Sequence, residues 1–379
     1  MRLLMFALAL VSLPACAWAQ EQDALQAGTD EVMAGLDFSG LEPLEIPGFG
    51  EAMSVEAFVR ALSSGQTLSP EDAVAGALSM FFDAWTGLGL MMLAIMLPVL
   101  LSSLLMHMFA SDRGSLFSLS RSVCFVLILI PILLVVFSEL EHTRSTITTM
   151  TQRMDKLLPM LLTLLTALGG SASSAFLHPM VVAASGSMVF LAREVTLRLV
   201  MCTCAVTAVN HLSDRTHLSR MAQLLRSCVC WLLGVSFTVF LGAMSLQGVC
   251  SASIDGVALR AAKYAVDNFV PVVGGMFSDT MDTLVGCTLI VKNALGVAAV
   301  VVLLGAILGP LMRTLAVVMV MKLSAALLEP VADSEIVRAI GDFSRTIVLF
   351  LITMLCVATM YFLLIVQMLL VGNLTVLLR

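Results

Sequence analysis

Long apolar runs separated by short polar stretches recur from about residue 85 to the end of the chain. The clearest runs cover residues 85–109, 122–138, 228–246, 284–308, 311–328 and 347–371. A membrane span needs roughly 20 mostly apolar residues, because the hydrocarbon core of a bilayer is about 30 Å thick. Helices satisfy their own backbone hydrogen bonds in lipid. The pattern therefore predicts an all-α, polytopic helical membrane protein.

The count of spans is about seven, and residues 157–209 are its ambiguous region. Gly169 and Gly170 interrupt this region, which fits one full span with a re-entrant pair as well as three short spans. We expect re-entrant or broken helices here. Elsewhere, Gly309-Pro310 is expected to separate one span from the next, because proline removes a helical hydrogen bond. Residues 139–156 are polar and predict an amphipathic helix at the membrane surface.

The first 19 residues have the features of a signal peptide. Arg2 precedes a short apolar stretch, and Ala17-Trp18-Ala19 fits an A-x-A cleavage site. An uncleaved anchor and lipidation at Cys16 are the alternatives. The sequence thus predicts a signal peptide (1–19), an acidic extracytoplasmic segment (20–84) and a multispan membrane domain (85–379).

Acidic residues concentrate in the segment expected to be exported. Residues 20–84 hold 12 acids and one base, which leaves 14 acids and 18 bases outside this segment and Arg2. Positive charge on the membrane domain agrees with the positive-inside bias, so the arginine-rich loops near residues 113–121 and 215–226 are expected on the cytoplasmic side. Helices are expected at residues 54–62 and 69–82. The segment is either a small cap or a docking surface for another exported protein.

Composition argues against an enzyme. Charged residues make up only 12% of the chain, and its five histidines are scattered without an i, i+4 pair that would chelate zinc. Nucleotide-binding and hydrolase motifs are absent from the sequence, and its basic residues are too dispersed for nucleic acid. We therefore predict no catalytic residue, no metal ligand, no cofactor and no nucleic-acid partner. The lipid bilayer is the expected partner of the apolar helices.

A polar face after residue 278 is the strongest candidate site. At 100° per residue, several small or polar residues of one helix fall near one line, with Lys292 on the flank. These residues are Asp279, Asp282, Gly286, Asn293 and Gly296. A helix break at Pro271, Gly274 and Gly275 precedes them. The face either lines a polar midplane site, as in transporters with broken helices, or permits close helix packing.

Glu194 and Arg198 are a second candidate, as a possible intramembrane ion pair. They are four residues apart in the favourable order for a helical pair. A functional intramembrane pair and an interfacial salt bridge at a turn are both consistent with this spacing.

Several runs of residues resemble stage III sporulation protein AE. They are Phe176-Leu177-His178-Pro179, Thr238-Val239-Phe240-Leu241-Gly242, Ser245-Leu246-Gln247-Gly248, Asp255-Gly256-Val257-Ala258-Leu259-Arg260, residues 268–279, Lys292-Asn293-Ala294-Leu295-Gly296-Val297 and Gly372-Asn373-Leu374-Thr375. The resemblance extends over most of residues 85–379, whereas the acidic segment matches poorly.

The resemblance implies a role in endospore formation. It suggests a membrane component of a mother-cell channel or secretion-like complex, serving as a non-enzymatic platform or conduit in the cell membrane. The implied partners are the other stage III sporulation A-operon proteins and, through the complex, stage II sporulation protein Q. A stand-alone secondary transporter or permease is the alternative, suggested by the expected broken helix and intramembrane charges.

Overall fold

The computed structural model describes residues 29, 32–34, 54–63, 70–109, 115–168, 171–212, 218–269 and 274–377, while the side chains of residues 247–284 fall outside the description. Every element of these residues is a helix. They are α3 (Val55–Ser63), α4 (Pro70–Gly87), α5 (Gly89–Phe109), α6 (Ser115–Ala167), α7 (Ser171–Phe190), the π-helix η1 (Leu191–Thr196), α8 (Leu197–Leu212), α9 (Ser219–Phe269), α10 (Gly274–Leu328) and α11 (Ser334–Leu377). The predicted all-α class is confirmed.

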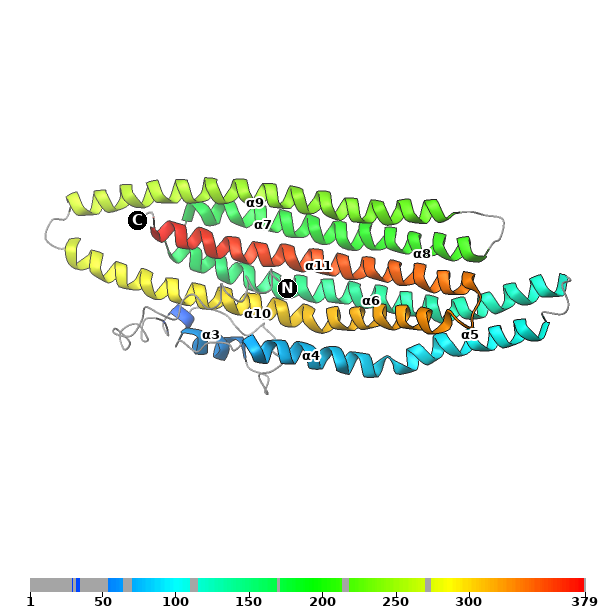
Figure 1. The fold of residues 1–379 in the computed structure, drawn as a ribbon. Coiled ribbons are helices and arrows are strands. Elements are labelled where there is room, and N and C mark those ends of the chain that lie inside the picture. The colour runs from blue at the N-terminus through cyan, green and yellow to red at the C-terminus, as the bar shows by residue number, and fades with distance from the viewer. Residues whose placement is uncertain are drawn as a thin grey trace.

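The helices lie side by side along one axis (Figure 1). Four of them, α6, α9, α10 and α11, have 53, 51, 55 and 44 residues. At 1.5 Å per residue these helices are about 65–85 Å long, at least twice the hydrocarbon thickness of a bilayer. Each therefore extends beyond the hydrocarbon on one or both sides.

Fewer and longer helices replace the expected seven spans. Within the described residues, four helices are long and apolar enough to cross a membrane, or five if the bent pair Leu78–Gly87 and Gly89–Leu104 forms one span. The expected separation at Gly309-Pro310 is wrong, because α10 continues through Pro310. Helices packed around such a proline stabilise it by contacts that an isolated helix lacks. The predicted surface helix at residues 139–156 is likewise the middle of α6.

The ambiguous region forms a second long helical run rather than short pieces. After α6 ends at Ala167, α7, η1 and α8 follow one another from Ser171 to Leu212 and run antiparallel to α6 (Figure 1). Helix α6 consequently begins at the end of the bundle where α8 ends and α9 begins. The helix ends that flank the two arginine-rich loops, near residues 113–121 and 215–226, therefore lie at the same end of the bundle. The charge distribution predicts that these loops are on one side of the membrane.

The N-terminal helices pack against the membrane bundle. Both expected helices are present, as α3 and α4, and they lie along α10 (Figure 1). Helix α3 buries Val55, Phe58 and Val59 in the common core. Helix α4 passes without a break through the expected domain boundary at residue 84 and meets α5 at a bend of 40°. The expected signal peptide lies outside the described residues.

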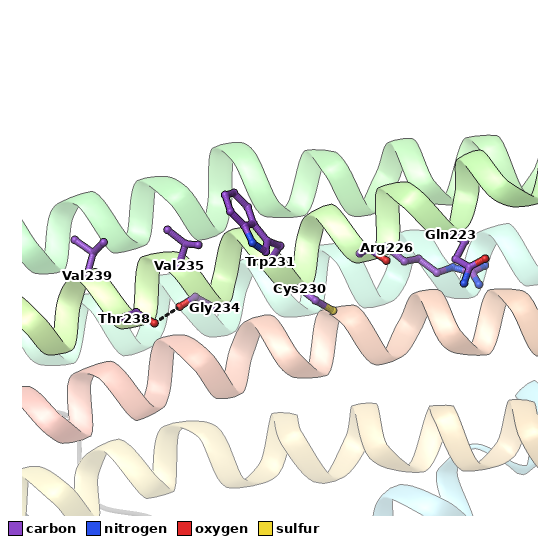
Figure 2. A pocket seen from close by; sticks show the side chains of 9 residues that line it. Gln223, Arg226, Cys230, Trp231, Gly234, Val235, Thr238 and Val239 are labelled. Carbon is purple, nitrogen blue, oxygen red and sulfur yellow. Dashed lines mark hydrogen bonds between the residues drawn. The ribbon is translucent and has the colours of Figure 1, made fainter.

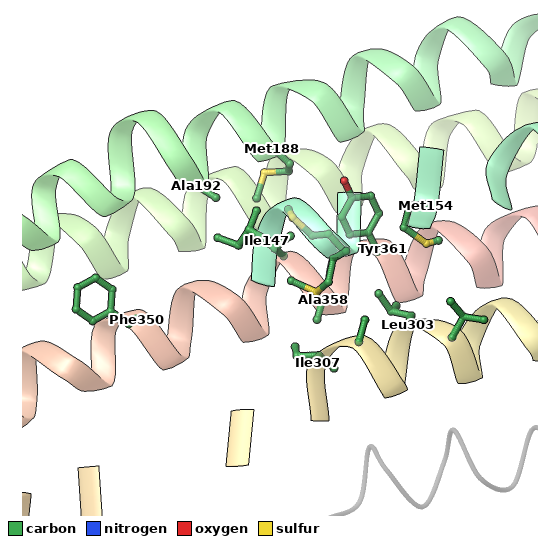
Figure 3. Packing of buried hydrophobic residues seen from close by; sticks show 14 of the residues in the cluster. Ile147, Met154, Met188, Ala192, Leu303, Ile307, Phe350, Ala358 and Tyr361 are labelled. Carbon is green, nitrogen blue, oxygen red and sulfur yellow. The ribbon is translucent and has the colours of Figure 1, made fainter. Parts of the chain in front are cut away.

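The core lies between α6, α7, α10 and α11 (Figure 3). Ile147 and Met154 of α6 and Phe350 of α11 are fully buried there. Tyr361 of α11, 3% exposed, donates a hydrogen bond to Thr151 Oγ1 of α6 at 3.2 Å. This bond satisfies a polar group within the apolar core and fixes the axial register of the two helices.

The shared end of the bundle gives a topology prediction. Single cysteines at Ser219 and Ser334 should react with an impermeant thiol reagent only after the cells are permeabilised, in a protein whose own cysteines have been replaced. A cysteine at Ala167, which is exposed at the other end of α6, should react from outside in intact cells. Labelling of all three positions from the same side would contradict the arrangement.

Candidate functional site: polar groups buried between the helices

Lys292 of α10 is buried between two helices. Its side chain is 1% exposed, and Nζ donates hydrogen bonds to the Leu369 carbonyl oxygen at 2.8 Å and to Asn373 Oδ1 at 3.2 Å. A buried ammonium costs several kcal/mol unless it has such partners. Lys292 therefore ties α10 to the C-terminal turns of α11.

Gly372 makes this contact possible. A Cβ atom at this position would overlap the Lys292 side chain at Nζ. Gly372 thus provides the space and Asn373 the acceptor for one lysine. Two of the sequence runs that carry the family resemblance, the one from Lys292 and the one from Gly372, meet at this point in the fold.

The other residues of the predicted polar face separate into different environments. At Gly296 a Cβ would overlap the Leu369 side chain, so this glycine permits close packing of α10 on α11. At Gly286 a Cβ would have no neighbour within 4 Å among the residues whose side chains the structure describes. Asn293 is half-buried. Gly274 and Gly275 begin α10, so the expected break is a junction between helices.

Three predicted residues of this region cannot be placed in the site. Pro271 and the side chains of Asp279 and Asp282 lie outside the described residues.

A second buried group joins α6 to α10. Glu139, 1% exposed, accepts a hydrogen bond from Thr314 Oγ1 at 2.8 Å, and Arg313 Nε lies 4.0 Å from its Oε1. Arg313 Nη1 also lies 3.5 Å from His142 Nδ1. The sequence places Glu139 at the membrane surface. In the structure α6 continues past Glu139, and the carboxylate is buried against α10.

A third group is centred on Asp342 and joins α8, α9 and α11. Its Oδ2 lies 3.1 Å from His211 Nε2, and its Oδ1 accepts hydrogen bonds from Arg226 at 3.4 Å and Arg345 at 3.3 Å. Arg226 also donates to the Asp342 carbonyl oxygen at 3.1 Å and to Thr207 Oγ1 at 3.4 Å. These contacts fasten three helices at the end where α8 and α9 meet.

The spacing of these groups matches the dimensions of a bilayer. Lys292 and Thr314 are 22 residues apart on α10, or about 33 Å along a helix, close to the hydrocarbon thickness. Asp342 and Asn373 are 31 residues apart on α11, or about 46 Å, close to the thickness that includes the headgroups. The region of α10 between Lys292 and Arg313 is uninterrupted by a charged residue.

The predicted ion pair of Glu194 and Arg198 forms, with Arg198 donating to Glu194 Oε2. Glu194 lies in the π-helix η1 and Arg198 in the first turn of α8. The two side chains are 34% and 76% exposed. The pair joins neighbouring turns of one helical run and, unlike the three groups above, does not link separate helices.

Sequence reasoning missed the groups around Glu139 and Asp342, because their partners are distant in the chain. Glu139 and Thr314 are 175 residues apart, and Asp342 is 131 residues from His211. In the sequence, the evidence for each of these groups was only one carboxylate beside an apolar run. Among the described residues, no group of three or more His, Cys, Asp or Glu side chains could hold a metal ion. The buried groups instead link helices and fix their register.

Long apolar helices joined by buried polar contacts define a helical membrane protein. A sequence model described as stage III sporulation protein AE matches residues 53–372. The chain belongs to the stage III sporulation protein AE family. It is also 26% identical over 371 residues to stage III sporulation protein AE of Bacillus subtilis (strain 168), covering 95% of this chain and 93% of that protein. No solved structure matches the chain.

The two helix-face glycines give a stability prediction with an internal control. Gly296→Leu should destabilise the protein by about 1–3 kcal/mol, because the added side chain overpacks the contact with Leu369. Gly286→Leu adds the same atoms to the same helix where none of the described side chains is close, so it should leave stability nearly unchanged. Thermal unfolding in detergent compares the two. Equal destabilisation would contradict this account of α10–α11 packing.

Proposed function

We propose that this sporulation protein is the multi-pass subunit of a cell-membrane complex, where it serves as a non-enzymatic platform or conduit. Its N-terminal acidic segment is exported in this proposal. The partners would be the other stage III sporulation A-operon proteins and, through them, stage II sporulation protein Q. Family membership supports the sporulation role, and the surface of α6 supports the role in an assembly.

Helix α6 carries a stripe of exposed polar residues along one side. We define the α6 stripe as Glu141, Arg144, Ser145, Gln152, Asp155 and Lys156, all exposed. At 100° per residue, these six positions fall within about 60° of one line. The stripe is about 23 Å long at 1.5 Å per residue. It therefore forms a continuous polar track on the outside of the bundle.

The α6 stripe lies at the depth where other helices present apolar side chains. Thr151, within its length, contacts Tyr361 of α11, and the bond from Gln367 Nε2 to the Met244 carbonyl oxygen aligns α11 with α9. At this level Val239 of α9 is 66% exposed and Leu355 of α11 is 51% exposed. One depth of the molecule thus has an apolar side and a polar side.

Lipid is a poor environment for the polar side. A charged residue at the centre of a bilayer costs roughly 2.5–3.5 kcal/mol on insertion scales. Four members of the α6 stripe are charged, so contact with hydrocarbon along its length would cost several times that amount. Water or the polar surface of another protein avoids this cost. The charged α6 stripe at this depth is therefore the observation that favours a conduit or a subunit of an assembly.

The stand-alone transporter is the second candidate function. That alternative rests on a broken helix at Pro271–Gly275 that would line a midplane site. Helix α10 begins at Gly274 and continues without interruption to Leu328. The expected break therefore falls at the junction between α9, which ends at Phe269, and α10, and the α6 stripe gives the assembly role the stronger support.

Replacing polar residues of the stripe by leucine tests the proposal. The double variant Ser145→Leu/Gln152→Leu should remain inserted at normal level but should lower the yield of heat-resistant spores and the co-isolation of partner proteins. The reason is that leucine makes apolar a surface that contacts water or another protein in this proposal. Spore counts, immunoblots and affinity isolation from the same cultures give the three measurements.

A matched control changes an apolar position at the same depth. Leu355→Phe on α11 adds bulk on the apolar side and should leave spore yield and co-isolation unchanged. If the α6 stripe faced lipid, the leucine substitutions would be favourable and spore formation would be normal. That result would reject the α6 stripe as the functional surface.

A further inference from the structure

Two adjoining cavities lie on α9 near the Asp342 group. One is a polar cavity of about 440 Å³ between α8, α9 and α11, bordered by Asn210, Arg226, Asp342 and Arg345. The other is an open groove of about 830 Å³ that follows α9 from Gln223 and Arg226 toward Val239. Gln223 and Arg226 line both, so the polar cavity and the groove adjoin at these two residues, which lie at one end of the groove (Figure 2).

Among the described residues that line it, the polar cavity has two arginines and one carboxylate. Arg226 and Arg345 donate to the same oxygen of Asp342, so two guanidinium groups surround one carboxylate. Among the described residues the Arg226 Nε–H is buried without a hydrogen-bond partner, and Arg345 remains 72% exposed. Guanidinium groups bind phosphate through paired N–H donors. The cavity therefore has donors and charge to accept an anion.

The groove is apolar and follows one face of a helix. Trp231, Val235 and Val239 recur every four residues and are 71%, 40% and 66% exposed (Figure 2). From Arg226 to Val239 the groove extends about 20 Å along α9 at 1.5 Å per residue. That length exceeds one half of the hydrocarbon core, about 15 Å. An exposed tryptophan next to an arginine is typical of the level where headgroups meet acyl chains.

We propose that this pair of cavities binds an anionic phospholipid. The headgroup phosphate contacts Arg226 and Arg345, and one acyl chain lies along Trp231, Val235 and Val239. Basic pockets between helices on the cytoplasmic side of a membrane suit anionic headgroups. The groove adds the apolar half of the same ligand, which a free phosphate ion lacks. The lipid would bridge α8, α9 and α11 at the end of the bundle where α8 leads into α9.

Binding to the full-length protein in detergent tests this site. Native mass spectrometry counts bound lipid as phosphatidylglycerol or phosphatidylcholine is added, and glycerol 3-phosphate serves as the headgroup without chains. Phosphatidylglycerol should bind more tightly than phosphatidylcholine, and glycerol 3-phosphate should neither bind nor compete at matched concentration. Equal binding of the two lipids would overturn the proposal, and so would saturation by glycerol 3-phosphate alone.

Two exposed residues of the site permit substitution without disturbing the core. Arg345→Gln should weaken phosphatidylglycerol binding about tenfold, as expected for the loss of one charge-assisted hydrogen bond. Trp231→Ala should weaken binding of both lipids while it leaves their order unchanged. Arg338→Gln, an arginine on the same helix as Arg345 but outside the lining of both cavities, is the matched control and should bind normally.

The control also separates a specific site from general charge attraction. An equal loss from Arg338→Gln and Arg345→Gln would show that phosphatidylglycerol responds to total charge, and would overturn the site. Undiminished binding by both Arg345→Gln and Trp231→Ala would show that the lipid binds elsewhere, and would overturn the site.

Discussion

Polar groups that are buried between long apolar helices must find their partners inside the protein, and this requirement sets the register of the whole bundle. Lys292 reaches the Leu369 carbonyl oxygen and Asn373, and Glu139 reaches Thr314. Sliding α10 by one turn would leave a buried polar group without its partner in each contact, at a cost of about 1–3 kcal/mol each. The helices are therefore aligned by a few polar contacts, while the apolar core supplies their general attraction.

That alignment determines which surfaces meet at one depth. Tyr361 and Gln367 fix α11 relative to α6 and α9. As a result, the charged side of α6 lies beside the apolar sides of α9 and α11 instead of above or below them. A single molecule with two such surfaces is suited to lipid on one side and to water or protein on the other. The proposed complex and the proposed lipid site both follow from this division.

The sequence was sufficient for the fold class but insufficient for the number and length of the helices. Apolar runs predict membrane helices because lipid requires internal backbone hydrogen bonding. Local signals then mislead: Pro310 is typical of a helix end, and the polar stretch after Glu139 is typical of a segment outside the membrane. Both lie within continuous helices, since contacts with neighbouring helices outweigh local preference. Lys292 belongs to the predicted site, but its partners near Gly372 are too distant in sequence for periodicity to identify them.

Spin-label accessibility in liposomes tests the two-sided surface most directly. Nitroxide labels at Gln152 of α6 and Val239 of α9 report collisions with oxygen, which concentrates in lipid, and with a water-soluble nickel chelate. The account predicts that Val239 collides mainly with oxygen, whereas Gln152 collides mainly with the nickel chelate. Oxygen-dominated collisions at both positions would show that α6 faces lipid and would contradict the account.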